Sequence, residues 1–406
     1  MHVRRIAVLV ARMLVGVAFI VAGWAKAIDP WGFVIKIGEY LGVWGLSVPH
    51  ELVVTAAVAL ACVEFCTGVM IAVGAFKRMS VLTAAAFMLF MLPLTAYIAI
   101  ADPVDDCGCF GDFIILSNTA TFIKNIVLTG LIVYLLMYNR SVKGLFPVPV
   151  QWMTMTFSVA FPLYLAVMGY NVQPLVDFRP FATGKPVFGL VDEEASDPLY
   201  YIYEKDGVEQ HFSLDALPDS TWTYVDAVIP ERDGATISVY DEYGADISAE
   251  LAEMQGDVLY LVTPTPDSRI LSHARELTDL ARYCSGHNTT LLAIVGADDG
   301  AEDEWLSLVR PTYPVYTAET VSLKMLARGT SALVFVRDGI IQWKRTLKSF
   351  DSDILLDNRP GAEALAAVEP VDAGRPHMIA WAVYLAAMLL TYLLGLSPKL
   401  LPKCKK

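Results

Sequence analysis

Two cysteines separated by a single residue are the strongest chemical signal in this chain. Cys107 and Cys109 lie in the run 105–112 (Asp-Asp-Cys-Gly-Cys-Phe-Gly-Asp), where a long apolar segment ends. Gly108 and Gly111 allow the backbone to turn sharply there. A disulfide across one intervening residue closes a very small, strained ring, and strain makes a disulfide more oxidising. The pair is therefore a candidate catalytic site for thiol–disulfide exchange, with a structural role or metal binding as the alternatives.

Three carboxylates flank this pair: Asp105, Asp106 and Asp112. Negative charge close to a thiol raises its pKa, so a smaller fraction of the sulfur is present as the reactive thiolate. The sequence thus predicts a pair that is suited to exchange by its spacing but slowed by its neighbours.

A second group of candidates lies inside the apolar segment 52–74. Cys62 and Cys66 are four residues apart, so they share one face of a helix. Buried cysteines usually serve packing. The alternatives are a second dithiol, a relay to the outer cysteine pair, or a four-sulfur metal site, whose spacing does not match known zinc modules. We assign no metal ligand.

Glu64 lies between these two cysteines, near the middle of the same segment. A carboxylate inside a bilayer is costly unless it is paired, neutral or hydrated. We expect its partner among three cations: Lys26, Lys124 and Arg12. Two interpretations stay open. Glu64 forms a structural ion pair between helices, or it handles protons or contacts a ligand as part of the catalytic site.

Membrane helices must position these residues. Hydrophobic residues make up 55% of the 406 residues. Several uncharged runs have the length of about 20 residues that a helix needs to cross a bilayer. We predict six spans, at 6–24, 52–74, 80–101, 119–138, 151–170 and 377–396.

The distribution of basic residues predicts the sidedness of these spans. Basic clusters precede the first span, separate the second from the third and the fourth from the fifth, and follow the sixth (Arg4 and Arg5; Lys77 and Arg78; Arg140 and Lys143; Lys399, Lys403, Lys405 and Lys406). All four clusters fall on one side if every span crosses, and the positive-inside rule makes that side the cytoplasm. We expect cytoplasmic N- and C-termini and a first span that is retained. The Cys107–Cys109 loop and residues 171–376 then lie outside.

Residues 171–376 form the water-soluble part of the chain. They contain 16 Lys and Arg against 35 Asp and Glu, whereas the rest of the chain has a net charge of +6. An acidic domain argues against nucleic acid as a partner, because nucleic-acid binding needs a basic surface. Membrane lipid and a protein client on the outer side are the partners that we expect.

The pattern predicts an α-helical membrane protein with an inserted α/β domain. Its parts are a four-helix bundle (1–140), a cytoplasmic linker with the fifth span (141–170), a β-rich segment (171–255), a thioredoxin-like domain (256–350), a linker (351–376), the sixth span (377–396) and a basic tail (397–406). The connection 28–50 carries Trp31, Tyr40 and Trp44, which suit a loop anchored at the membrane surface.

Within the β-rich segment, Lys205-Asp206-Gly207 between two β-prone runs predicts a hairpin. From residue 256 the order β-α-β-α-β-α-β-β predicts a thioredoxin-like sheet. This domain lacks a Cys-x-x-Cys motif, since Thr-Pro-Thr-Pro occupies 263–266, and Ser331 stands where a cis-proline normally precedes the last hairpin. Cys284 is alone at a helix end. We therefore expect a redox-silent binding module.

Several positions of the predicted helical bundle and of the insert resemble a known family. The bundle is similar to DoxX-like and MauE-type (methylamine-utilisation) membrane proteins. The matching positions are Phe19 to Gly23, Lys26, Asp29-Pro30, Glu64, Gly68, the run 107–112, Asn118 and the run 121–128. Matches in the insert, such as Phe178-Arg179-Pro180, resemble Bacteroidetes-type members with a long periplasmic insert.

The resemblance implies a bacterial inner-membrane (cytoplasmic-membrane) protein. MauE-type relatives are linked to maturation of a periplasmic, disulfide-rich dehydrogenase, and DoxX-like relatives to quinone-coupled sulfur oxidation. The bundle also resembles vitamin-K-epoxide-reductase-like enzymes, which couple dithiols to quinone, so quinone is the one cofactor that the resemblance suggests. This chain departs from those enzymes because it has no Cys-x-x-Cys at a helix end.

Two functional hypotheses follow. In the first, the protein is a thiol–disulfide oxidoreductase that matures a periplasmic client through Cys107 and Cys109, with Cys62, Cys66 and Glu64 passing electrons and protons to quinone. In the second it is a non-enzymatic scaffold or assembly subunit that binds a partner through its pseudo-thioredoxin domain. A transporter is less favoured, because the spans contain few polar residues.

Overall fold

The computed structural model describes residues 2–104, 106–138, 144, 146–188, 200–205, 208–213, 217–218, 221–228, 237–356, 364–372 and 374–400. The chain divides into two compact units. The membrane unit comprises residues 1–183, 327–333 and 343–406, and the α/β unit comprises residues 184–326 and 334–342. The short segment 327–333 therefore belongs with the helices, although it lies far from them in the sequence.

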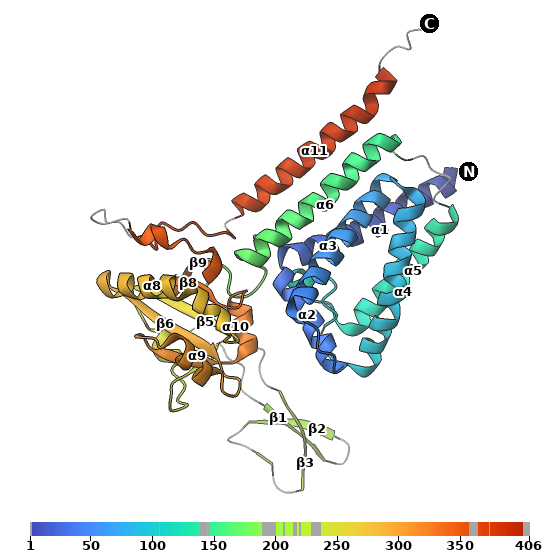
Figure 1. The fold of residues 1–406 in the computed structure, drawn as a ribbon. Helices are drawn as coiled ribbons and strands as arrows, with labels where there is room; N and C mark the ends of the chain where they lie inside the picture. Colours follow the sequence, from blue (N-terminus) through green and yellow to red (C-terminus); the bar gives the residue numbers. More distant parts are fainter. Residues whose placement is uncertain are drawn as a thin grey trace. The chain divides into compact units, whose positions relative to one another are not determined.

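Six long apolar helices form the membrane unit: α1 (His2–Ile28), α3 (His50–Val73), α4 (Lys77–Ala101), α5 (Asn118–Tyr138), α6 (Val148–Asn171) and α11 (Arg375–Leu400). Each is long and apolar enough to cross a membrane, which confirms the six predicted spans and makes this a multi-pass membrane protein. α1 packs on α3, α4 on α5, and α6 on both α3 and α11 (Figure 1). Large apolar side chains such as Leu89 and Ile100 remain exposed on the outer faces, as lipid contact requires.

Small residues bring α1 and α3 into backbone contact. A methyl group on Gly23 would overlap the backbone of Phe65, and one on Gly68 would lie 2.6 Å from the amide nitrogen of Ile20. Without side chains between them the two helices can pack closely, which is how helices associate in lipid. This contact sets the distance between the residues that follow on the two helices.

The connection 28–50 is mainly helical, so its description as a loop was wrong. Helix α2 (Pro30–Val43) begins at the N-cap Asp29, whose side chain accepts a hydrogen bond from the amide of Gly32 (2.9 Å). Pro30 at the first helical position has no amide hydrogen to leave unsatisfied, which favours a helix start. Trp31 packs inward, stacks on Tyr170 (4.8 Å between ring centroids) and donates to its carbonyl oxygen (2.9 Å).

The β-rich segment contains a three-stranded antiparallel sheet. Its strands are β1 (Tyr200–Lys205), β2 (Val208–Ser213) and β3 (Thr223–Val228), in the order β2-β1-β3. Lys205 pairs with Val208, which confirms the predicted hairpin, although its turn residues Asp206 and Gly207 lie outside the described residues.

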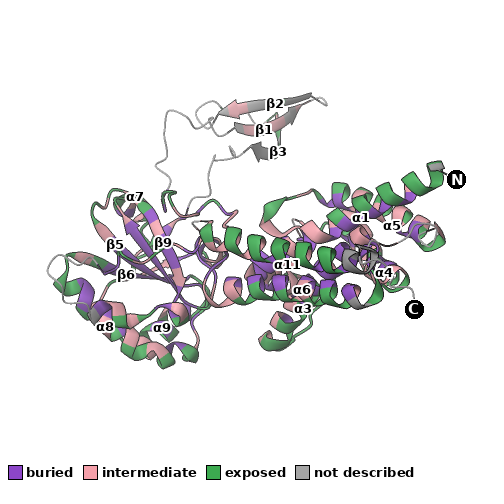
Figure 2. Cartoon of the chain, turned by 90° about the horizontal axis from the view of Figure 1, so that it is seen from above, coloured by how far each residue is buried: buried purple, intermediate pink, exposed green. Residues whose placement is uncertain are grey.

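A mixed six-stranded sheet follows. Its strands are β4 (Val239–Tyr240), β5 (Asp257–Thr263), β6 (Thr289–Gly296), β7 (Val315–Ala318), β8 (Ala332–Arg337) and β9 (Ile340–Thr346), in the order β4-β7-β6-β5-β8-β9. Strands β5, β6 and β7 are parallel, and β4 is antiparallel to β7. The connecting helices are α8 (Ala274–Gly286), α9 (Ala301–Val309) and α10 (Thr320–Leu326), with α7 (Ser248–Ala252) before β5. β5 and β6 are almost wholly buried (Figure 2), as parallel strands covered by helices must be.

This element order confirms the predicted α/β domain, while its likeness to thioredoxin remains a prediction. The predicted connections are described only in part. In the linker predicted to be cytoplasmic, residues 139–143 and 145 lie outside the described residues, as do 357–363 and 373 in the second linker and 401–406, with Cys404, in the basic tail. Helix α11 continues to Leu400, four residues beyond the predicted end of the sixth span.

Candidate functional site at the Cys107–Cys109 loop

The two cysteines lie in contact in the loop between α4 and α5. Their sulfur atoms are 2.9 Å apart, and both thiols are free. The loop turns through left-handed backbone at Gly108 (φ +66°) and Gly111 (φ +52°), and the amide of Gly108 donates to the side chain of Asp106 (2.6 Å). Glycine adopts this conformation without strain. The predicted turn is therefore present, and it brings the two thiols together.

Three helices hold the backbone of this loop. From α2, the Tyr40 hydroxyl donates to the carbonyl oxygen of Cys107 (3.0 Å), and Lys36 forms an ion pair with Asp106 (3.0 Å). From α1, Lys26 donates to the carbonyl oxygen of Cys109 (2.6 Å). At the start of α5, the Asn118 amide donates to the carbonyl oxygen of Val104 (2.8 Å). The positions of both sulfurs are thus determined by the bundle rather than by the loop alone.

Lys26 is also the partner of Glu64. Its ammonium nitrogen lies 2.7 Å from a carboxylate oxygen of Glu64, and the two side chains are only 7% and 14% exposed. Of the three cations expected, Lys26 is the one that pairs. Arg12 donates to the carbonyl oxygens of Ile71 (2.9 Å) and Ala72 (3.1 Å) at the end of α3. One ammonium therefore connects the intramembrane carboxylate to the backbone of Cys109.

Lys124 lies on the other side of the loop. Its ammonium nitrogen is 4.3 Å from the centre of the Phe110 ring, directly beside Cys109 in the sequence. A hydrogen bond from the Cys107 thiol, followed by the positive charges of Lys124 and Lys26, lowers the pKa of Cys109 to about 7, although burial acts in the opposite direction. The hydrogen bond to Cys109 and burial raise the pKa of Cys107.

The expected effect of the flanking carboxylates was wrong for Cys109. Asp106 is neutralised by Lys36, and Asp112 forms an ion pair with Arg328 (2.7 Å), so the nearest charges that act on Cys109 include two cations. Asp105 lies outside the described residues. The physical reason is distance in sequence, since the partners of these carboxylates come from other parts of the chain.

Sequence reasoning missed Arg328, which completes the surroundings of the loop. Arg328 is 5% exposed, and its guanidinium donates to both carboxylate oxygens of Asp29 (2.6–3.2 Å) as well as to Asp112. The backbone of Arg328 exchanges two hydrogen bonds with the side chain of Gln173 (2.7 and 3.1 Å). Burial raises the pKa of Asp112, and the positive charge of Arg328 acts in the opposite direction. Asp29 and Asp112 were visible in the sequence, but nothing near them indicated their common partner.

Cys62 and Cys66 lie apart from this cluster. Both are 7% exposed on α3, and Cys66 belongs to an apolar cluster with residues such as Phe65 and Val69. In the described part of the chain no disulfide joins either of them to another cysteine. Within the same residues no three His, Cys, Asp or Glu side chains are grouped as metal ligands, so the four-sulfur alternative has no support from the geometry.

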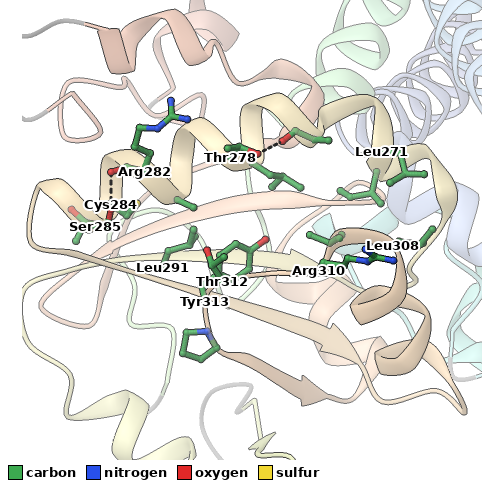
Figure 3. A pocket seen from close by; sticks show the side chains of 17 residues that line it. Leu271, Thr278, Arg282, Cys284, Ser285, Leu291, Leu308, Arg310, Thr312 and Tyr313 are labelled. Atoms are coloured by element: carbon green, nitrogen blue, oxygen red, sulfur yellow. Dashed lines mark hydrogen bonds between the residues drawn. The ribbon is translucent and has the colours of Figure 1, made fainter.

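The α/β unit contains a separate cavity of about 580 Å³ between α8 and the segment 308–314 (Figure 3). Its walls are mainly apolar, with Cys284 at one side. Burial raises the pKa of Cys284 to about 12, so this thiol stays protonated and unreactive at neutral pH. Cys284 is therefore no candidate for thiol–disulfide exchange at neutral pH.

Two family models match parts of the chain. Residues 4–138 match the family model described as methylamine utilisation protein MauE. These residues form a MauE-type membrane domain. The match covers α1 to α5 and the whole Cys107–Cys109 loop of the MauE-type domain, which confirms the resemblance to MauE-type proteins. The resemblance of the insert to Bacteroidetes-type members stays a prediction. Residues 199–229, which include β1 to β3, match a domain of unknown function (DUF8463). Searches of curated proteins and of solved structures found no match.

Proposed function

We propose that this MauE-type protein is a membrane thiol–disulfide factor that acts on an exported client protein. The observation that carries the proposal is the contact between Cys107 and Cys109, in a turn that α1, α2 and α5 hold in place. Two cationic side chains act on Cys109, and reactive cysteines are found in such electropositive surroundings. This arrangement favours redox chemistry over a purely structural role for the pair.

The proposed reaction transfers a disulfide. Two client thiols become a disulfide while the Cys107–Cys109 disulfide becomes two thiols, so two electrons and two protons pass from the client to the pair. To work again, the pair must return these electrons to a two-electron acceptor, and a membrane quinone is the class of acceptor that we propose. Lys26 and Glu64 are the groups beside the loop that can exchange the accompanying protons. Cys62 and Cys66 are retained only as candidates for a relay.

The proposed compartment favours oxidation of the client thiols by the Cys107–Cys109 disulfide. The basic clusters favour a cytoplasmic location for both termini, which places the loop on the outer side of the bacterial inner membrane. Disulfides form and persist there, whereas the cytoplasm keeps thiols reduced. The description of the family names methylamine utilisation. We take from it a role in maturing an exported protein and no particular substrate.

Trapping the redox state of the pair in intact cells tests this proposal. Cells are quenched in acid, and free thiols are alkylated before and after reduction, with and without quinone. We expect Cys107 and Cys109 to change together from disulfide to dithiol when quinone is withdrawn, while Cys284 stays reduced. A pair that never changes state would contradict the proposal.

The cysteine variants give a second test. We expect Cys107→Ser and Cys109→Ser to lower the disulfide content of an exported protein, with Cys284→Ser as the matched control. An unchanged set of periplasmic thiols in both variants would count against thiol–disulfide exchange.

The second candidate function is that of a scaffold. It is favoured by one observation, namely that the α/β unit has Thr-Pro-Thr-Pro at 263–266 in place of a dithiol. A scaffold predicts that both cysteine variants keep full function. It also predicts that residues 171–376, kept in the full-length protein, are needed to retain a partner.

A further inference from the structure

We propose that the two thiols have different tasks: Cys109 forms the intermolecular disulfide with the client, and Cys107 is its internal partner. This inference rests on the proposed function and assigns the two sulfurs within it. Two features of the loop support the assignment: the exposure of the two residues and the groups that act on their thiols.

Access distinguishes the two residues first. Cys107 is buried, with 6% of its surface exposed, whereas Cys109 is partly exposed. Exchange requires that a client approach the pair closely. In the described loop Cys109 is the residue of the pair with more of its surface open to such an approach.

The groups that act on the two thiols are the second difference between Cys107 and Cys109. The groups that act on Cys109 come from three helices and the loop: Lys26 on α1, Glu64 on α3, Lys124 on α5 and Cys107 in the loop itself. From α2, Lys36 pairs with Asp106 and the Tyr40 hydroxyl donates to the carbonyl oxygen of Cys107. The hydrogen bond from the Cys107 thiol lowers the pKa of Cys109 most, the positive charges of Lys124 and Lys26 lower it further, and burial and the charge of Glu64 act in the opposite direction. The same hydrogen bond and burial raise the pKa of Cys107, so the thiolate of the reduced pair forms at Cys109.

The exchange then follows in two balanced steps. A client thiolate attacks the Cys109 sulfur; the Cys107–Cys109 bond breaks, a bond between client and Cys109 forms, and Cys107 leaves and takes up a proton. The second client thiolate then attacks the client sulfur of this mixed disulfide, and Cys109 leaves as a thiolate. A thiol of low pKa is the better leaving group, so the charges around Cys109 assist the second step. Cys107, 2.9 Å away, can reverse an unproductive mixed disulfide.

Reaction of the purified full-length protein with an aromatic disulfide, dithiobis-nitrobenzoate, tests the assignment. In Cys107→Ser the remaining thiol is Cys109, and in Cys109→Ser it is Cys107; peptide mapping reports which cysteine carries the probe. We expect Cys109 to react about tenfold faster at neutral pH, since the thiolate fraction controls the rate. Equal rates, or a faster Cys107, would overturn the assignment.

Two further measurements complete the test, and the first needs no variant. Wild-type protein treated with less than one equivalent of iodoacetamide, whose thioether Cys107 cannot displace, should be alkylated first at Cys109, and alkylation first at Cys107 would overturn the assignment. Lys124→Gln should slow Cys109 about threefold to fivefold by raising its pKa, whereas Lys185→Gln, at an exposed lysine of the α/β unit, should not. An unchanged rate in Lys124→Gln would contradict the role given to charge.

The outcomes separate this inference from the proposed function. If the wild-type pair exchanges with a dithiol probe such as dithiothreitol but Cys107 reacts first, the function stands and the assignment is wrong. If the wild-type pair forms no disulfide under any oxidant, the proposed function itself fails.

Discussion

At the scale of single residues, the described carboxylates that flank the two cysteines are matched by cations from other parts of the chain. Asp106 and Asp112 are both neutralised, by Lys36 and Arg328 respectively. The candidates Cys107, Cys109 and Glu64 could be named from sequence, because close thiols and an intramembrane carboxylate are unusual wherever they occur. The partner of Glu64 could be narrowed to three cations, of which the structure shows Lys26. The neutralisation could not be predicted, since Arg328 lies 216 residues from Asp112.

The pH dependence of alkylation is the first prediction at this scale. Because the pKa of Cys109 is lowered to about 7, its alkylation rate should rise through neutral pH and level off near pH 8, below the range of an ordinary thiol. Cys284, with its pKa raised to about 12, should remain unmodified over the same range and serves as the internal control. Iodoacetamide labelling followed by peptide mapping measures both. A Cys109 rate that still climbs steeply above pH 9 would contradict the electrostatic description.

The Lys26–Glu64 pair gives a second prediction. Lys26→Met leaves a buried carboxylate without its cation, which should lower the free energy of unfolding by about 3–5 kcal/mol. Lys26→Met combined with Glu64→Gln removes both charges and should lose less than the single variant. Thermal unfolding in detergent compares the wild type, the single variants Lys26→Met and Glu64→Gln, and the double variant. Strictly additive losses would show that the two side chains do not interact.

At the scale of elements, α2 shows what a sequence reading can overlook. The aromatic residues of 28–50 favoured a surface loop, but Asp29 followed by Pro30 is a helix-start signal that was present in the sequence. The helix matters because it carries Lys36 and Tyr40, which hold Asp106 and the carbonyl of Cys107. Helix α2, which the sequence suggested only as a membrane-surface anchor, therefore positions one of the two thiols.

The turn at Gly108 yields a prediction for the loop. Gly108→Ala forces a side chain into left-handed backbone and places its Cβ 3.0 Å from Cγ of Lys36, so we expect a loss of about 1–3 kcal/mol and slower closure of the disulfide. Gly184→Ala is the matched control, because Gly184 also has a positive φ (+84°) but no neighbour within 4 Å. Thermal unfolding and the rate of disulfide formation with a mild oxidant measure the two effects. If both variants close the disulfide equally fast, contact with Lys36 does not position the turn.

Arg328 gives a prediction for the segment 327–333. Arg328→Lys keeps a positive charge but loses the planar fork that binds Asp29 at two points, so it should still destabilise the membrane unit and loosen the cysteine loop. Arg345→Lys, at a partly exposed arginine that donates to the carbonyl of Glu369, is the control. Protection of Cys107 from alkylation reports the loosening. Unchanged protection would mean that Arg328 does not position the loop.

At the scale of the whole molecule, two structural features could be predicted from the sequence and a third could not. Long apolar runs predicted the six helices, and buried runs alternating with amphipathic ones predicted the order of strands and helices in the sheet, because both depend on local periodicity. That the segment 327–333 belongs to the membrane unit could not be predicted from the sequence, because it depends on contacts between residues far apart in the chain.

Sidedness is the prediction that belongs to this scale. Tyr243→Cys, at a residue that is 85% exposed in the acidic part of the chain, should react with an impermeant maleimide added to spheroplasts. Arg78→Cys, between the second and third spans, should react only after lysis. Peptide mapping separates this label from that on Cys109, and a label at position 78 in intact spheroplasts would reverse the proposed orientation.

The touching backbones of α1 and α3 limit how the sulfur site can vary. Gly23 lies one helical turn before Lys26, and Phe65 directly follows Glu64, so the point where the helices meet also sets the length that the lysine must bridge. A single added methyl group there would push the helix axes apart, and one ammonium could no longer reach both the carboxylate and the carbonyl of Cys109. A packing defect within the bilayer would then be detected as altered redox behaviour at its surface, with every reactive residue still in place.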